Sequence, residues 1–300
     1  MVNPANPLNL PDQLPIARYR LSFKLTTPLH LPPYAGSTLR GVFGHVLMEN
    51  GLDKLIFSAP PDGRLNSSQK QTPPPAYIIE APADGRRHYP AGGVYRFNIV
   101  LIGPIRHQLP LIVGSFQKAF GRGVGRAEGR GVLSALEVET EKSGWRDILS
   151  DGKIALHDNT IRLPAPYGGN VGMRFVTPLR LQQQGKVVSA GQFTAGIMLR
   201  QLMRRVSAMS SLYWQNTLNA DFGKLCAEAE RIRCRHDLHW QDWVRYSNRQ
   251  RQQMNIGGLM GTCEIDDIPL HFGQLLQLGR WLHIGKETVF GHGFYLLRNS

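Results

Sequence analysis

The two halves of the chain repeat one pattern of elements, and this repeat limits the possible folds more than any other feature. The pentapeptide Thr-Pro-Leu-His-Leu at 27–31 recurs as Thr-Pro-Leu-Arg-Leu at 177–181, each time after alternating apolar residues typical of a strand. Later in each half, a helical pattern leads into a glycine-rich basic loop and a last strand. In the first half the helix is at 109–116 and the loop at 121–131, and in the second half they are at 272–282 and 284–293. Each half therefore predicts the βαββαβ order of a ferredoxin-like (RRM-like) unit.

The sequence thus predicts an α+β protein with two tandem ferredoxin-like domains, residues 1–165 and 166–300, and a C-terminal glycine-rich loop. The boundary is expected in the Pro/Gly cluster at 163–169. The middle strands are expected at 76–80 and 94–102, then at 239–247 and 258–265. A surface loop is predicted at 58–75 and an extra helix within 191–235, and Asp266-Asp267 is expected to cap a helix that starts at Pro269.

Charge is the strongest compositional signal. The chain has 35 Lys and Arg against 22 Asp and Glu, a formal net charge of +13. This excess predicts a polyanionic partner, with nucleic acid favoured over an acidic membrane surface. Three cysteines without CxxC spacing argue against a disulfide framework or a zinc site and favour a reducing compartment. With no apolar run of about 18 residues and no signal-peptide pattern, we expect a cytoplasmic protein with no membrane partner.

Residues 37–48 (STLRGVFGHVLM) predict an amphipathic helix capped by Ser37 or Thr38. Its buried face is expected to comprise Leu39, Val42, Phe43, Val46 and Leu47. Gly41 and Gly44 would lie opposite, flanked by Arg40 and His45, where a second backbone or a ligand could come close. An imidazole exchanges protons near neutral pH, so His45 suits RNA cleavage. The alternative is a surface histidine with no chemical role.

The loop at 121–131 is a candidate phosphate-binding site. It places Arg122, Arg126 and Arg130 among glycines, whose backbone N–H groups can approach phosphate oxygens. Its spacing matches neither a dinucleotide-binding motif nor a P-loop, which argues against nucleotide hydrolysis. The second loop offers Gly285, Lys286, Gly291 and Gly293 for the same task. The alternatives are a solvated turn for the first loop and a structural β-bulge for the second.

A third basic stretch, residues 231–251, interleaves arginines with Trp240, Trp243 and Tyr246. Arginine with aromatic residues is typical of phosphate contact combined with base stacking. We expect Arg245, Arg249 and Arg251 to contact RNA, whereas each tryptophan could equally be core. The chain has no HExxH, paired Cys/His cluster or G-x-S-x-G motif, so neither a metal site nor a cofactor is expected.

The segments at 34–47, 121–131, 177–181 and 282–293 resemble the CRISPR precursor-RNA processing endoribonucleases, the sixth family of Cas proteins within the RAMP superfamily. The resemblance implies a metal-independent endoribonuclease that binds CRISPR repeat RNA (pre-crRNA), as a stem-loop, and cleaves it once per repeat. The ribose 2′-OH would attack the adjacent phosphate, leaving a 2′,3′-cyclic phosphate and a 5′-OH. By position, His45 would be the general base or acid, Tyr34 would orient the phosphate, and Lys54 would stabilise its charge. His30, His283 and His292 are rival histidines.

Two alternatives stay open at this stage. The first is a non-catalytic RAMP subunit that binds RNA within a CRISPR effector complex with other Cas proteins. The second is a general basic RNA-binding protein, which would show no preference for a repeat.

Overall fold

The computed structural model describes residues 7–58, 73–141, 144–214, 216, 218–247 and 252–299. Its contacts divide the chain into two compact units. The N-terminal unit is Gln13–Arg162 with Leu212–Trp214, and the C-terminal unit is Leu163–Ser211 and Gln215–Ser300 with Met1–Asp12. The division after Arg162 adjoins the Pro/Gly cluster in which a boundary is expected.

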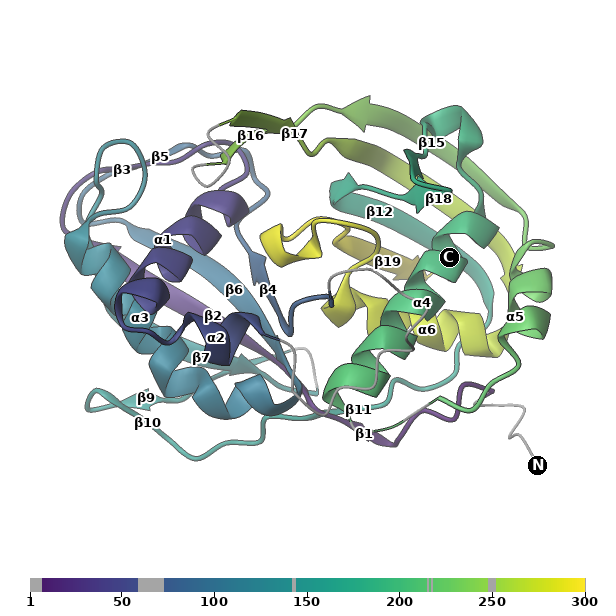
Figure 1. Ribbon diagram of the computed structural model, residues 1–300, viewed down its shortest axis with the longest axis horizontal. Coiled ribbons are helices and arrows are strands. Elements are labelled where there is room, and N and C mark those ends of the chain that lie inside the picture. The colour runs from purple at the N-terminus through teal and green to yellow at the C-terminus, as the bar shows by residue number, and fades with distance from the viewer. Residues whose placement is uncertain are drawn as a thin grey trace. The chain divides into compact units, whose positions relative to one another are not determined.

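The N-terminal unit is built on a five-stranded antiparallel sheet (Figure 1) with the strand order β4-β6-β2-β7-β8. The strands of this sheet are β2 (Ile16–Leu25), β4 (Tyr77–Glu80), β6 (Val94–Ile102), β7 (Gly131–Glu139) and β8 (Trp145–Asp147). Its helices are α1 (Gly36–Glu49), α2 (Asp53–Phe57) and α3 (Leu109–Arg122), the last preceded by the 3-10 turn η1 (Gly103–Gln108). Two-residue strands are β1 (Gln13–Leu14), β3 (Leu29–His30), β5 (His88–Tyr89), β9 (Leu149–Ser150), β10 (Lys153–Ile154) and β11 (Ile161–Arg162).

Strand alternation explains how this unit forms its core. Phe23 on β2 and Phe97 on β6 point to the same face of the sheet and stack at a ring-centroid distance of 6.2 Å. Helix α3 places Phe116 and Phe120 on them, with Phe23 and Phe120 only 4.0 Å apart. Helix α1 then packs through Phe43, which stacks on Phe116 at 4.9 Å. Both helices therefore cover the same face of the sheet.

The C-terminal unit repeats the plan with a four-stranded antiparallel sheet of order β15-β18-β12-β19 (Figure 1). Its strands are β12 (Gly169–Leu179), β15 (Cys234–Gln241), β18 (Gly258–Ile268) and β19 (Tyr295–Asn299). Its helices are α4 (Ala195–Tyr213), α5 (Phe222–Ala229) and α6 (Leu270–Leu282), with the 3-10 turns η2 (Ala190–Gln192) and η3 (Thr288–Phe290). Two small ribbons pair β13 (Gln182–Gln183) with β14 (Lys186–Val187), and β16 (Val244–Ser247) with β17 (Gln252–Asn255).

The strand orders confirm the predicted fold class. In each unit the first strand lies between the third and the fourth, and the second strand pairs with the third, as in a ferredoxin-like βαββαβ unit. The repeated pentapeptides lie at similar places, since residues 27–31 follow β2 and residues 177–181 span the end of β12. Within 191–235, where the sequence predicts an extra helix, the C-terminal unit has two helices, α4 and α5.

Several local predictions were wrong. Helix α1 has Ala35 at its N-cap with no side-chain hydrogen bond, because it starts before Ser37 and Thr38. Asp266 and Asp267 continue strand β18, and Pro269 takes the cap position of α6. Gly44 is buried, whereas it was expected opposite the buried face. Most of the predicted loop at 58–75 lies outside the described residues.

Candidate functional site

His45 lies on the exposed side of α1 and is 70% exposed. Its Nε2 lies 3.0 Å from a carboxylate oxygen of Glu49, one helical turn further on. The other oxygen of Glu49 binds the guanidinium of Arg122, at the end of α3. The hydrogen bond from Arg122 lowers the pKa of Glu49, and His45 lowers it further. The carboxylate is therefore ionised at neutral pH and can orient the imidazole of His45.

Glu49 was missed by the sequence analysis, although its i,i+4 spacing from His45 was a readable signal. Arg122 was predicted to contact RNA. It is half exposed but already has an acidic partner inside the unit. Arg122 belongs to α3, so only the packing of α3 against α1 brings it close to Glu49 and His45.

Arg40 is turned toward the protein rather than outward. Its guanidinium carbon lies 4.1 Å from the centroid of the Phe57 ring, a cation–π contact. Burial raises the pKa of the Tyr77 hydroxyl to about 12, and this rise is limited by the charge of Arg40 and its hydrogen bond to that hydroxyl. The guanidinium also occupies the space beside Gly44. The glycine therefore makes room for Arg40 rather than for a second backbone.

The other two predicted catalytic residues lie close to α1 in the chain. Tyr34 is half-buried immediately before the helix, and burial raises the pKa of its hydroxyl. Lys54 is exposed on α2, the short helix that follows α1. The roles of Tyr34 and Lys54 in catalysis stay predictions.

The loop at 121–131 lies directly against the β3–β5 ribbon. The backbone of Gly125 approaches the carbonyl of His30 so closely that no side chain would fit. On the ribbon, His30 pairs with His88, and their exposed rings meet edge to face at a centroid distance of 4.5 Å. Arg126 and Arg130 are exposed on the loop. The structure thus brings the first basic loop and the rival histidine His30 together, and adds His88, which the sequence analysis missed.

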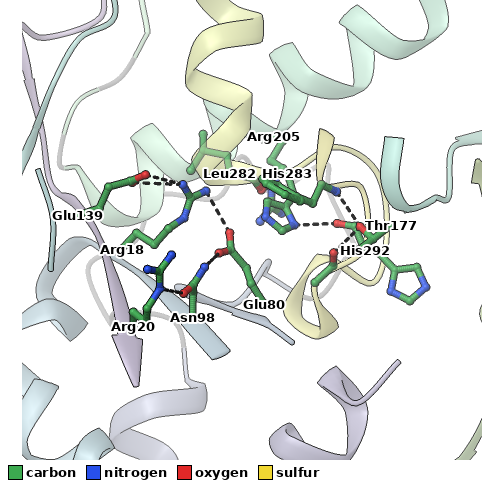
Figure 2. Close-up of polar contacts among 12 residues, drawn as sticks. Arg18, Arg20, Glu80, Asn98, Glu139, Thr177, Arg205, Leu282, His283 and His292 are labelled. Atoms are coloured by element: carbon green, nitrogen blue, oxygen red, sulfur yellow. Dashed lines mark hydrogen bonds and ion pairs between the residues drawn. The ribbon is translucent and has the colours of Figure 1, made fainter. Parts of the chain in front are cut away.

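Two buried histidines belong to the second glycine-rich loop and its start, His292 within the loop and His283 immediately before it (Figure 2). His283 Nδ1 lies 2.9 Å from the carbonyl oxygen of His292. His292 Nε2 lies 2.8 Å from the carbonyl oxygen of Ile256. The His292 ring stacks on Trp243 at 4.1 Å, and burial lowers its pKa to about 4. These two histidines are therefore buried structural groups, and neither offers a ring to solvent.

The remaining predicted residues of that loop divide between structure and surface. Gly293 has a φ of +71° and its α-carbon faces the carbonyl of Ile284, so only glycine fits. Thr177 Oγ1 donates to the carbonyl of Gly291 at 2.7 Å, which holds the loop on the end of β12. Lys286 is half exposed, and its backbone N–H donates to the carbonyl oxygen of Arg180 at 2.9 Å. Gly285, like Gly291, has a left-handed backbone at the turn.

The third basic stretch is only partly described. Arg245 lies in β16, but nothing is described of its side chain, and Arg249 and Arg251 lie outside the described residues. The two tryptophans differ, since Trp243 is buried and Trp240 is 39% exposed. Trp240 can therefore present a ring to a ligand, whereas Trp243 belongs to the core.

A polar network on the sheet of the N-terminal unit was not foreseen (Figure 2). Arg18 on β2 pairs with Glu80 on β4 at 3.0 Å and with Glu139 on β7 at 3.1 Å. Asn98 on β6 accepts from Arg20 and donates to Glu80. The alternation of basic and apolar residues along β2 was the available signal. The network ties four strands together on the face opposite the helices.

Among the described residues, no three His, Cys, Asp or Glu side chains gather in a way that could hold a metal ion. In the part of the chain that the structure covers, every helix is too short or too polar to cross a membrane.

Comparison with known proteins shows what each half of the chain is similar to. Residues 173–295 match the family model described as CRISPR-associated endoribonuclease Cas6, and this segment contains the second glycine-rich loop. Residues 14–161 match a different family model, the AF_1859_N N-terminal domain. The predicted resemblance to the sixth Cas family is confirmed, whereas no curated protein sequence matches the chain.

Solved Cas6 structures share the fold across nearly the whole chain. A Cas6 product complex is 13% identical, with a TM-score of 0.60 over 94% of this chain and 100% of that one. Thermus thermophilus Cas6 is also 13% identical, with a TM-score of 0.55 over 96% and 100%. A partial Cas6-RT-Cas1–Cas2 complex is 14% identical, with a TM-score of 0.61 over 95% of this chain. The chain spans 46% of that longer protein.

Proposed function

We propose that this protein is an endoribonuclease that binds CRISPR repeat RNA and cleaves the precursor once per repeat. The observation that carries the proposal is the match of residues 173–295 to the Cas6 endoribonuclease family. Two ferredoxin-like units and a net charge of +13 support it, because a polyanionic substrate needs a basic surface. The family match also favours a processing enzyme over a non-catalytic RAMP subunit.

Cleavage proceeds by transesterification within the RNA and requires no metal ion. The 2′-hydroxyl attacks the adjacent phosphorus, the bond to the 5′-oxygen breaks, and the products carry a 2′,3′-cyclic phosphate and a 5′-OH. His45 exchanges the proton in this step as general base or acid. Tyr34 orients the scissile phosphate, and Lys54 stabilises the charge that develops on its non-bridging oxygens.

Glu49 acts as a positioning residue for His45. A neutral imidazole that donates Nε2–H to this carboxylate leaves Nδ1 free to accept a proton, and the carboxylate stabilises the imidazolium that forms. Arg122 holds the second oxygen of Glu49 and so fixes the carboxylate from another helix. This arrangement supports His45 over His283 and His292, which are buried.

RNA is held by exposed cations on both units. Arg126 and Arg130 contact phosphates from the first basic loop, and Lys286 does so from the second. Arg245, Arg249 and Arg251 remain proposed contacts of the third basic stretch. Arg122 and Arg40 have internal partners, so their contribution to affinity is smaller than that of the loop arginines. Other Cas proteins are proposed partners by analogy with the Cas6-RT-Cas1–Cas2 complex.

Substitution of His45 tests this assignment. In single-turnover cleavage of repeat RNA, His45→Ala should slow the reaction by about 10²–10⁴-fold and leave RNA affinity unchanged, because only proton transfer is lost. Glu49→Gln should slow it less and alter the pH–rate profile, because Gln cannot stabilise the imidazolium. His107→Ala is the matched control, since His107 is an exposed histidine of the same unit. Equal rates for His45→Ala and His107→Ala would contradict the assignment.

A further inference from the structure

Two of the three cysteines lie together in the C-terminal unit. Cys234 begins the edge strand β15, and Cys263 lies in the adjacent strand β18, directly opposite His236. Residues two apart on a strand face the same side, so Cys234 and Cys263 are diagonal neighbours on one face of the sheet. Cys263 is fully buried, whereas Cys234 is partly exposed. All three cysteines are free thiols, and the third, Cys226, lies in α5.

The surroundings of Cys234 favour its thiolate. The thiol of Cys263 donates a hydrogen bond to it, and so does the backbone N–H of Ala195, the first residue of α4. The hydrogen bond from Cys263 is the largest cause that lowers the pKa of Cys234 to about 7, against the opposing effects of burial and of the charge of Asp266. Donating that hydrogen bond raises the pKa of Cys263, and burial raises it further. Cys234 is therefore the more acidic and the more reachable of the two thiols, whereas Cys263 is shielded.

We propose that Cys234 and Cys263 form a peroxide-responsive dithiol, with Cys234 as the attacking thiol and Cys263 as the resolving thiol. The Cys234 thiolate attacks one oxygen of hydrogen peroxide, the O–O bond breaks, and hydroxide leaves, so that a sulfenic acid forms on Cys234. The Cys263 sulfur then attacks the Cys234 sulfur, and the sulfenic oxygen leaves as water with the Cys263 proton. Two thiols are oxidised to one disulfide, and one peroxide is reduced to two waters.

The fold suits this sequence of steps. Solvent exposure directs the oxidant to Cys234 first, since Cys263 has no accessible surface. The second step needs no solvent, because Cys263 is the diagonal cross-strand neighbour of Cys234 on the same face of the sheet. Diagonal positions are wider apart than a relaxed disulfide prefers, so β15 must shift, and an edge strand held by one neighbour can do so. Disulfides of proteins in a reducing compartment are mostly of this transient, redox-sensing kind.

The test uses the reduced full-length protein and hydrogen peroxide. After peroxide treatment the chain is denatured, alkylated with N-ethylmaleimide and weighed intact without reductant. We expect a chain lighter by two hydrogens with one adduct, located on Cys226 by peptide mapping, and three adducts after reduction with dithiothreitol. Cys226→Ser should keep the disulfide. Cys263→Ala should stop at the sulfenic acid of Cys234, which dimedone captures.

Three adducts on the peroxide-treated wild-type chain, or a disulfide that includes Cys226, would overturn the proposal. Removal of a buried side chain could unfold the Cys263 variant, so Cys234→Ser provides a second arm at a partly exposed position. This variant should leave Cys263 fully alkylated after the same treatment. Oxidation of Cys263 in that variant as fast as in the wild type would show that Cys234 is not the attacking thiol.

Discussion

Two glycines of α1 should respond in opposite ways to the same substitution. A methyl group added at Gly41 meets nothing within 4 Å, whereas one added at Gly44 collides with the guanidinium of Arg40. Replacement of a helix-interior glycine by alanine stabilises a helix by about 1 kcal/mol. We therefore expect Gly41→Ala to raise the free energy of unfolding by about 1 kcal/mol.

The Gly44→Ala variant gains the same helix propensity but must displace Arg40. Displacement removes the cation–π contact with Phe57, worth about 0.5–1 kcal/mol. It also removes the charged hydrogen bond to the buried hydroxyl of Tyr77, worth about 1.5–3 kcal/mol. The net expectation is a loss of about 1–3 kcal/mol relative to the wild type.

Denaturant-induced unfolding of five proteins measures this directly: the wild type, Gly41→Ala, Gly44→Ala, Arg40→Ala, and the Arg40→Ala, Gly44→Ala double variant. Without Arg40, the Gly44→Ala change should become stabilising by about 1 kcal/mol, because nothing remains to be displaced. A Gly44→Ala variant as stable as Gly41→Ala would refute the placement of Arg40. Weaker RNA binding by the more stable Gly41→Ala variant would instead indicate that RNA lies across Gly41.

Two further predictions concern pH and salt. His292 has a folded-state pKa of about 4 against about 6.5 when unfolded, so the unfolded chain binds its proton first as the pH falls. The contribution of His292 to the free energy of unfolding is fully present above about pH 6.5, and about 3 kcal/mol of it is lost by pH 4. Unfolding curves of His292→Gln should lack this part of the pH dependence. Arg126→Ala and Arg130→Ala should each lower the slope of log affinity against log salt by about one in RNA-binding titrations, whereas Lys153→Ala, an exposed control, should not. Unchanged slopes would remove the first basic loop from the RNA interface.

The periodic parts of the fold could be predicted from the sequence. Strand β6 matches its expected range, and α1 extends the expected helix by one residue at each end, because both have a strong apolar period. The repeat of a strand followed by Thr-Pro-Leu placed the first strand of each sheet. These signals are local, so a single sequence is enough to read them.

Contacts between segments far apart in the chain could not be predicted. Strands β3 and β5 have two residues each, too few for any period, so the pairing of His30 with His88 was invisible. Arg40 has a long side chain that could point either way, and the ring of Phe57 decides its direction. The loop at 284–293 has the composition of an exposed phosphate loop, yet His292 within it and His283 immediately before it are buried. The burial of His292 depends on the ring of Trp243, which stacks on it, and on the carbonyl of Ile256, which bonds to it, and both residues come from another part of the unit.

Cleavage of a modified substrate tests the proposed activity most directly. The substrate is the repeat RNA of the host's own CRISPR array, compared in single-turnover reactions with EDTA against copies that carry one 2′-deoxy sugar each. We predict one cut per repeat, undiminished by EDTA, and blocked only by the deoxy sugar on the 5′ side of the scissile phosphate. Tight binding without a cut would contradict the account and would make the protein an RNA-binding RAMP subunit.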